Sequence, residues 1–114
     1  MSNRIFKVNS LLKEEISKII QREVEFPPGT IITISSVNTS ANLIEAKVHV
    51  SVFPEDKSEK ILRILRKRIF AIQQQLNRKL KMRPTPKIIF LQDTVSSSAS
   101  RVEEILEQLK NEEK

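Results

Sequence analysis

The sequence predicts a small α+β domain in the order helix–strand–strand–helix–strand–helix, with the helices covering one face of a three-stranded sheet. The chain has 114 residues, which is enough for one hydrophobic core but not for two domains. Apolar residues recur at helical spacing in three segments, and three other segments are rich in β-branched residues. Prolines and polar stretches separate these segments, so each is expected to form its own element.

The first half of the chain predicts one helix and an antiparallel hairpin. Within residues 3–24 apolar side chains recur every three or four positions and therefore share one helix face. They are Ile5, Val8, Leu12, Ile16 and Ile19. The Pro-Pro-Gly turn at 27–29 ends this helix, because proline cannot donate to the helical hydrogen-bond ladder. Residues 30–38 and 43–53 are predicted strands joined by the short polar link 39–42, and alternation in the second strand predicts one wet face.

A long helix is predicted after Pro54, running to about Met82. Asp56 and Glu59 have the spacing of a capping box, and the prolines at 84 and 86 cannot continue a helix. About 26 helical residues would span about 39 Å, whereas a compact domain of this length is about 34 Å across. The helix is therefore expected to bend, break or protrude.

The last part of the chain predicts a strand and a helix. Residues 87–93 are apolar on both faces, which favours a central place in the sheet, although their direction stays open. Ser100–Glu103 is a second capping box ahead of a final helix that ends near Leu109. Residues 111–114 are expected to be frayed, which leaves a single domain over residues 1–110.

The charges of the chain are separated along the sequence. Between Lys57 and Lys87 there are 11 basic residues and one acid, Glu59, which gives this window a net charge of +10 within a chain of +6. The last 14 residues contain five glutamates. Such separation favours a polyanionic partner that meets one face of the fold.

On a helical wheel the predicted long helix has one apolar and one basic face. The apolar stripe from Ile61 to Leu80 covers about 100°. Opposite it lie Lys60, Arg63, Lys67, Gln74, Arg78 and Lys81. Regularly spaced cations on a rigid helix can bind backbone phosphates with little ordering cost. A merely solvated face would usually mix signs, so the pattern favours a basic ridge that contacts nucleic acid.

Two side chains on polar faces are candidates for a role in binding or catalysis. Phe70 lies at the edge of the basic face, where it could stack on an RNA base; we favour instead a kink near residues 69–71 that turns it inward. His49 lies on the polar face of its strand, and the chain has no second histidine and no cysteine. A solvated or RNA-facing imidazole is therefore favoured over a metal ligand or a general base.

Composition excludes several classes of protein. The chain has no cysteine, which excludes disulfides, thiolate nucleophiles and cysteine zinc sites, and its single glycine excludes phosphate-binding glycine loops. The carboxylates form no recognisable catalytic pair, so we expect no enzyme, no cofactor and no small-molecule substrate. No apolar run approaches the roughly 20 residues of a membrane span, and the first residues lack a signal-peptide pattern, so we expect a cytoplasmic protein.

Three motifs follow one another in a specific order. They are residues 40–52 (Ser-Ala-Asn-Leu-Ile-Glu-Ala-Lys-Val-His-Val-Ser-Val), residues 80–90 (Leu-Lys-Met-Arg-Pro-Thr-Pro-Lys-Ile-Ile-Phe), and Asp93 followed by Arg101-Val102. Together they resemble ribosome-binding factor A, a bacterial family of small-subunit assembly factors with a KH-like (type II) fold. The resemblance extends from Arg4 to about Leu109.

The resemblance implies direct binding to the small ribosomal subunit and its precursor rRNA during late maturation and 5′-end rRNA processing. It also implies a monomer without catalysis or cofactor, and a link to growth in the cold. Family members lack the Gly-x-x-Gly loop of ordinary KH domains, as this chain does, so side chains must make the contacts. The candidate RNA-binding residues are Lys60, Arg63, Arg66, Lys67, Arg78, Lys79, Lys81, Arg83 and Lys87, of which Arg83 in the Met-Arg-Pro motif is the leading one.

This chain departs from the family at the middle of the long helix. Family members carry an Ala-x-Gly interruption there, whereas Arg68-Ile69-Phe70 stands at that place here, so the bend is expected to be reduced or made differently. The alternative function is a non-enzymatic protein-interaction module that uses the basic helix or the acidic C-terminal residues. Membrane-surface binding is less favoured, because the apolar face of the helix is expected to be committed to the core.

Overall fold

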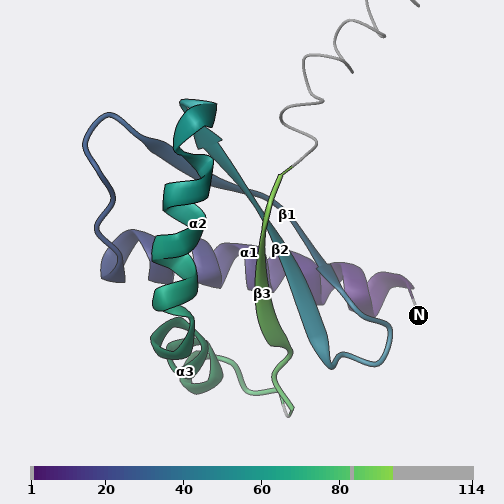
Figure 1. Cartoon of the computed structure of the whole chain (residues 1–114). Helices are drawn as coiled ribbons and strands as arrows, with labels where there is room; N and C mark the ends of the chain where they lie inside the picture. Colours follow the sequence, from purple (N-terminus) through teal and green to yellow (C-terminus); the bar gives the residue numbers. More distant parts are fainter. Residues whose placement is uncertain (1, 83, 94–114) are drawn as a thin grey trace, which may run out of the picture.

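The computed structural model describes residues 2–82 and 84–93, which form a three-stranded sheet with helices on one face (Figure 1). The elements are α1 (Ser2–Glu23), β1 (Ile31–Thr39), β2 (Glu45–Phe53), a 3₁₀ turn (Glu55–Lys57), α2 (Ser58–Lys67), α3 (Ile69–Lys79) and β3 (Lys87–Gln92). The predicted α+β class is confirmed. The expected final helix, its capping box and the frayed residues 111–114 lie outside the described residues.

The first helix and its turn match the sequence pattern. Leu12, Ile16 and Ile19 on α1 are each at most 2% exposed and pack into the core, as their spacing predicted. After α1, Gly29 has φ +81°, a left-handed conformation that L side chains rarely adopt, which explains why a glycine follows the two prolines. The hydroxyl of Thr30 donates to the carbonyl of Pro27 at 2.6 Å and closes the turn.

The hairpin is antiparallel, and polar side chains shape its loop. β1 pairs with β2 from Ile31 opposite Phe53 to Thr39 opposite Ala46, with a bulge between residues 34 and 36. The Ser40 hydroxyl oxygen accepts hydrogen bonds from the backbone N–H groups of Ile44 and Glu45 at 3.2 and 3.1 Å. The loop therefore depends on a side chain of the family motif 40–52.

The expectation that the third strand is central is wrong. The strand order is β1-β2-β3, so β2 is central, and β3 pairs with it in parallel from Lys87 beside Glu45 to Gln92 beside Val50. Apolar residues on both faces of a strand indicate that the faces are covered, but they do not show that both edges are paired. Here Ile88 and Phe90 are buried among the helices, while Ile89 and Leu91 are half-buried on the other face.

Side chains from the helices cover the outer edge of β3. The N–H of Ile88 donates to the Gln73 amide oxygen at 2.8 Å, and the Gln73 amide nitrogen donates to the Pro86 carbonyl at 3.1 Å. Further along the strand, the Arg66 guanidinium donates to the Phe90 carbonyl at 3.0 Å. These bonds satisfy backbone groups that a neighbouring strand would otherwise pair, and so protect an exposed sheet edge.

Replacing Gln73 by leucine is expected to lower the free energy of unfolding by about 1 to 3 kcal/mol, because the Ile88 N–H and the Pro86 carbonyl lose their partner. Urea unfolding followed by circular dichroism measures this change. Gln74→Leu is the matched control, since Gln74 is the adjacent, exposed residue, and its effect is expected to stay within about 0.5 kcal/mol. Equal losses in the two variants would show that the edge contacts contribute nothing.

The predicted long helix breaks at Arg68. This residue has φ −96° and ψ 4°, a conformation open to any residue, so no glycine is needed. Its N–H is shared between the carbonyls of Ile64 and Leu65 at 3.2 and 3.1 Å, which tightens the last turn of α2. Figure 1 shows α2 along its length and α3 almost end-on, so the two axes diverge sharply. The expected bend is confirmed, and it is made differently from the family's glycine interruption.

The predicted capping box at Asp56 is wrong. A 3₁₀ turn precedes α2, so the residue at the N-cap is Lys57, and no side chain caps either helix start. The spacing of the motif is correct, but the extra turn moves the start of α2 past Asp56.

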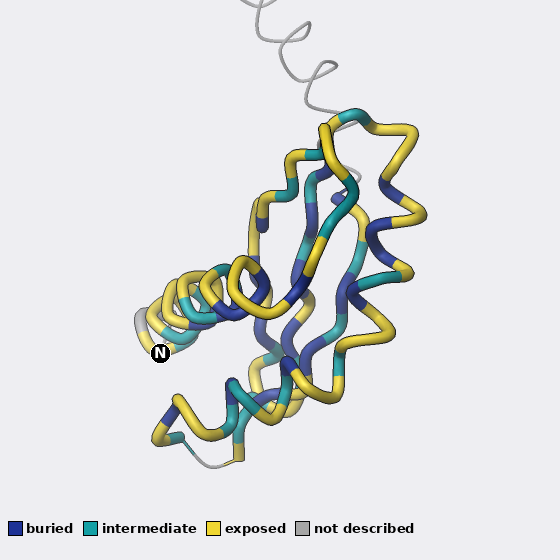
Figure 2. The backbone as a smooth tube through the Cα atoms, turned by 90° about the vertical axis from the view of Figure 1, so that its left-hand side faces the viewer, coloured by how far each residue is buried: buried dark blue, intermediate teal, exposed yellow. Residues whose placement is uncertain are grey.

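The core lies between the helices and one face of the sheet (Figure 2). Its largest fully buried side chains include Phe90, Leu12, Ile16, Leu65 and Leu76. Every described helix contributes to this layer, and the alternation of β2 places Ala46, Val48, Val50 and Val52 in it. The apolar face of α2 is therefore committed to the core, as expected.

Candidate nucleic-acid interface

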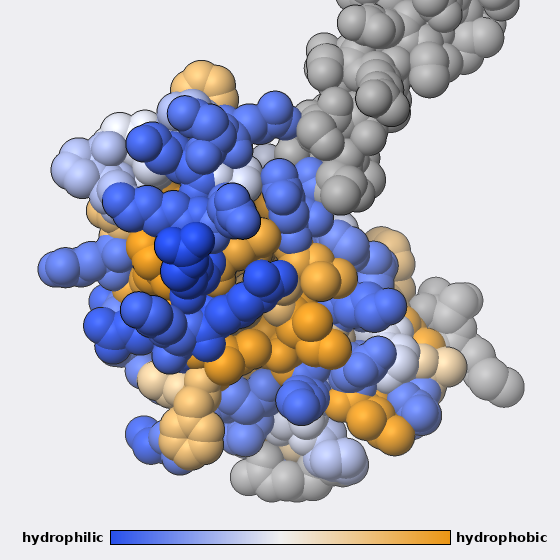
Figure 3. All heavy atoms as spheres, viewed as in Figure 1, coloured by the Kyte–Doolittle hydropathy of each residue, from blue (hydrophilic) through white to orange (hydrophobic). Residues whose placement is uncertain are grey.

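α2 presents a row of cations to solvent. Lys60, Arg63 and Lys67 follow one another at three- and four-residue spacing and are exposed, while Ile61 and Leu65 on the opposite side are 0% exposed. Burial of the apolar side fixes the rotation of the helix, so the cations must point outward. Figure 3, seen from the same side as Figure 1, shows hydrophilic side chains gathered over α2.

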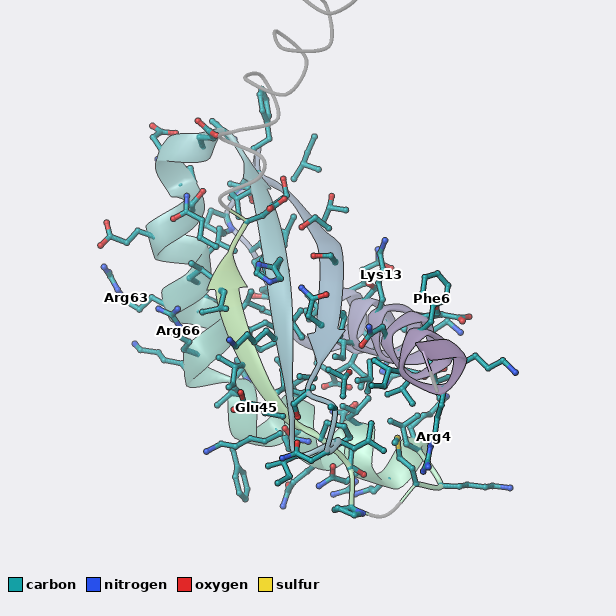
Figure 4. All side chains as sticks on the ribbon, turned by 90° about the vertical axis from the view of Figure 1, so that its right-hand side faces the viewer. Arg4, Phe6, Lys13, Glu45, Arg63 and Arg66 are labelled. Atoms are coloured by element: carbon teal, nitrogen blue, oxygen red, sulfur yellow. The ribbon has the colours of Figure 1, made fainter. Side chains whose placement is uncertain are left out.

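An open hollow of about 350 Å³ lies beside this row and is lined by Glu59, Arg63, Arg66 and Lys67. Figure 4 shows Arg63 and Arg66 on the same part of α2. The bond from Arg66 to the Phe90 carbonyl ties one side of its guanidinium to β3. A guanidinium carries five N–H donors, so Arg66 keeps donors for an anion while its position is fixed.

The cations of α2 and α3 have no carboxylate partner within residues 2–82 and 84–93. The ion pairs in that part of the chain all lie on α1: Lys18 with Glu14 at 3.2 Å and with Glu15 at 3.9 Å, and Arg22 with Glu23 at 3.2 Å. The sequence explains why these ion pairs do not extend to α2 and α3, because no acid occurs between Glu59 and Asp93. Over the described ranges, therefore, no ion pair neutralises a cation of α2.

The single continuous basic ridge that one helical wheel predicted is wrong. The break at Arg68 divides it into a cluster on α2 and another at the end of α3. The first cluster, which we call the α2 cluster, consists of Lys60, Arg63, Arg66 and Lys67. The second, the α3 cluster, consists of Arg78, Lys79 and Lys81. All seven side chains are exposed, as is Lys87 at the start of β3, whereas Arg83 lies outside the described residues.

Sequence reasoning missed two exposed residues at the break. Arg68 falls about 340° around the wheel from Ile61, just outside the apolar stripe and away from the basic face, so it was not among the candidate residues. In the structure Arg68 is exposed, and Phe70 is 72% exposed, which contradicts the inward position we favoured. An arginine beside the apolar stripe was the signal available, because a buried guanidinium without a partner is costly.

Residues 2–82 and 84–93 show neither a metal centre nor a membrane span. Over those ranges no group of three His, Cys, Asp or Glu residues could hold a metal ion. None of the helices in this part of the chain contains an apolar stretch of the length that spans a bilayer. His49 is half-buried on the open face of the sheet, and Lys47 and Ser51 are its neighbours on that face.

A model of the ribosome-binding factor A family matches residues 4–106 of this chain. The chain belongs to the ribosome-binding factor A family. Ribosome-binding factor A of Akkermansia muciniphila is 38% identical to it over 109 residues, covering 96% of this chain and 86% of the relative. The resemblance carried by the hairpin and Met-Arg-Pro motifs is therefore confirmed.

Solved structures of ribosome-binding factor A share the fold. The crystal structure from Thermus thermophilus is 25% identical, covers 77% of this chain and 94% of its own, and has a TM-score of 0.68. A homology model of the Thermus thermophilus factor, fitted into an electron cryo-microscopy map of a 30S complex, is 27% identical, covers 76% of this chain and 92% of its own, and has a TM-score of 0.64.

Proposed function

We propose that this protein binds the small ribosomal subunit and its precursor rRNA during late maturation and 5′-end rRNA processing. Its family membership supports this, as does the similarity to a ribosome-binding factor A that was fitted into a 30S complex. We propose further that it acts as a single RNA-binding domain over residues 1–110, as a cytoplasmic monomer, and in growth at low temperature.

The α2 cluster carries this proposal. Its cations have no carboxylate partner among the described residues, they border an open hollow, and α2 is fixed to the core by its apolar face. Folded RNA presents phosphates at regular intervals, and Arg can bind one through two parallel hydrogen bonds. A rigid row of cations therefore fits an RNA backbone with little loss of side-chain and backbone freedom.

The composition of the chain determines how it can recognise RNA. With one glycine in 114 residues it cannot clamp a backbone with a glycine loop, so charged side chains must make the contacts. Phosphate contacts position a protein on RNA but carry little sequence information, so shape should dominate recognition. We propose that the protein acts without catalysing a reaction and without a cofactor.

The salt dependence of binding tests this mode. If about six phosphates are neutralised, the logarithm of the affinity for small subunits is expected to fall with the logarithm of the salt concentration at a slope of about −4 to −5. Co-sedimentation at several potassium chloride concentrations measures the slope. A slope near zero would rule out phosphate contacts as the source of affinity. Binding that survives complete digestion of the RNA would instead support the protein-interaction alternative.

A further inference from the structure

The corner between α2 and α3 carries an exposed aromatic ring. Phe70 is the second residue of α3, and 72% of it is exposed, whereas Ile72 two positions later is 1% exposed and part of the core. Phe70 belongs neither to the core cluster nor to the hydrophobic residues packed against it. The ring therefore projects from the point where the chain changes direction, and the fold does not use it.

The surroundings of Phe70 are cationic. Lys67 ends α2 and Arg68 forms the break, so two exposed cations closely precede the ring on the chain. Phe53, another exposed phenylalanine at 67%, is followed instead by the acids Glu55 and Asp56. Of these two exposed rings, only Phe70 adjoins the α2 cluster proposed to contact RNA.

An aromatic ring beside cations has a recurring use in RNA binding. Unpaired bases stack on exposed aromatic side chains, while neighbouring cations hold the phosphates on either side. Every base has a flat face, so such stacking needs no particular sequence, but it does need a base that is not already stacked within a duplex. Ala71, the next residue, is exposed as well, and its small side chain adds no bulk beside the ring.

We propose that Phe70 stacks on an unpaired base of the RNA that the α2 cluster contacts. This inference rests on the proposed function and deepens it. The cations bind any RNA backbone, whereas Phe70 adds affinity only where a nucleotide is bulged or single-stranded. The corner between α2 and α3 thus directs the protein to the junctions and loops of RNA rather than to uninterrupted duplex.

The chain contains no tryptophan, so Phe70→Trp introduces a single fluorescent reporter at the proposed contact. An RNA hairpin with one unpaired adenine is the probe, and the same hairpin without the extra nucleotide is the control RNA. Stacking is expected to quench the emission of the variant with the bulged hairpin and to leave it nearly unchanged with the fully paired one. Phe53→Trp, on the acidic side, is the matched control and should respond to neither.

The affinity of a second variant tests the energetic role. Phe70→Leu keeps an apolar side chain but cannot stack, and it is expected to bind the bulged hairpin about 5- to 150-fold more weakly, the equivalent of about 1 to 3 kcal/mol. Phe70→Trp is expected to keep the affinity of the unaltered chain. Circular dichroism should be the same for all variants, because the ring lies outside the core.

The outcomes separate this inference from the proposed function. If Phe70→Leu binds as tightly as the unaltered chain, or if both hairpins quench the reporter equally, stacking is wrong while RNA binding by the α2 cluster stands. If the unaltered chain binds neither the hairpins nor small subunits, the proposed function itself fails. Quenching with the bulged hairpin alone, together with weaker binding by Phe70→Leu, supports stacking.

Discussion

Changing Lys60, Arg63 and Lys67 together to glutamate is expected to weaken binding to small ribosomal subunits by about 100- to 1,000-fold. Each substitution removes a cation that meets a phosphate and adds a carboxylate that repels it. The fold should persist, because these side chains are exposed and none has a carboxylate partner among the described residues. Co-sedimentation with purified small subunits at fixed salt measures the loss, and circular dichroism confirms the fold.

A matched variant distinguishes the effect of the cations on α2 from the effect of the net charge of the chain. Arg4, Lys7 and Lys13 are exposed cations on α1, and their replacement by glutamate changes the net charge of the chain by the same amount. Figure 4 shows Arg4 and Lys13 on α1, beside the edge of the sheet opposite to the edge at which Arg63 lies. Salt screens charges beyond about 8 Å at physiological ionic strength, so this variant should lose less than about tenfold. A loss equal to that of the α2 variant would show that affinity follows net charge alone.

Sequence periodicity was sufficient to predict the elements that have one buried face and one exposed face. α1 and the hairpin appear within two residues of the predicted bounds, because the period of apolar residues directly reports which side is buried. The polar face of β2, with Lys47 and His49, was predicted for the same reason. The family motifs added the identity of the fold, which periodicity alone does not provide.

The break in the long helix could not be predicted from periodicity. Ile61 and Leu65 in α2 and Ile72 and Leu76 in α3 are all buried, and a single wheel groups them because a break of one residue hardly changes their rotation. A wheel assumes one straight axis and therefore cannot detect a change of direction. The length of the helix indicated a bend, and the kink expected near residues 69–71, like the family's interruption at 68–70, lies within a few residues of the observed break at Arg68.

The same limit applies to the candidate site. Exposure of five candidates follows from their place opposite the apolar stripe, and it was predicted correctly for Lys60, Arg63, Lys67, Arg78 and Lys81. Their grouping depends on the direction of α3, so the division into the α2 and α3 clusters was not predictable. The place of β3 was missed for a related reason, since its covered edge depends on Gln73 and Arg66, which are far away in the sequence.

Changing Phe90 to alanine is expected to lower the free energy of unfolding by about 3 to 5 kcal/mol. Its ring is 1% exposed and is the largest fully buried side chain among the described residues, and its carbonyl accepts the hydrogen bond from Arg66. The substitution leaves a cavity in the core, at the strand to which Arg66 of α2 is hydrogen-bonded. Because small domains are stable by only about 5 to 15 kcal/mol, urea unfolding should shift to much lower concentrations.

Phe70→Ala is the matched control for this loss, because it removes the same ring from a position that is 72% exposed. Its effect on stability is expected to stay within about 0.5 kcal/mol. Equal losses would mean that the ring of Phe70 is packed against the domain, and the stacking proposal would then fail with it. Full stability of Phe90→Ala would mean that β3 does not anchor α2. The two rings differ in one respect that matters for function: Phe90 helps to hold the α2 cluster in position, whereas Phe70 is left free to meet a ligand.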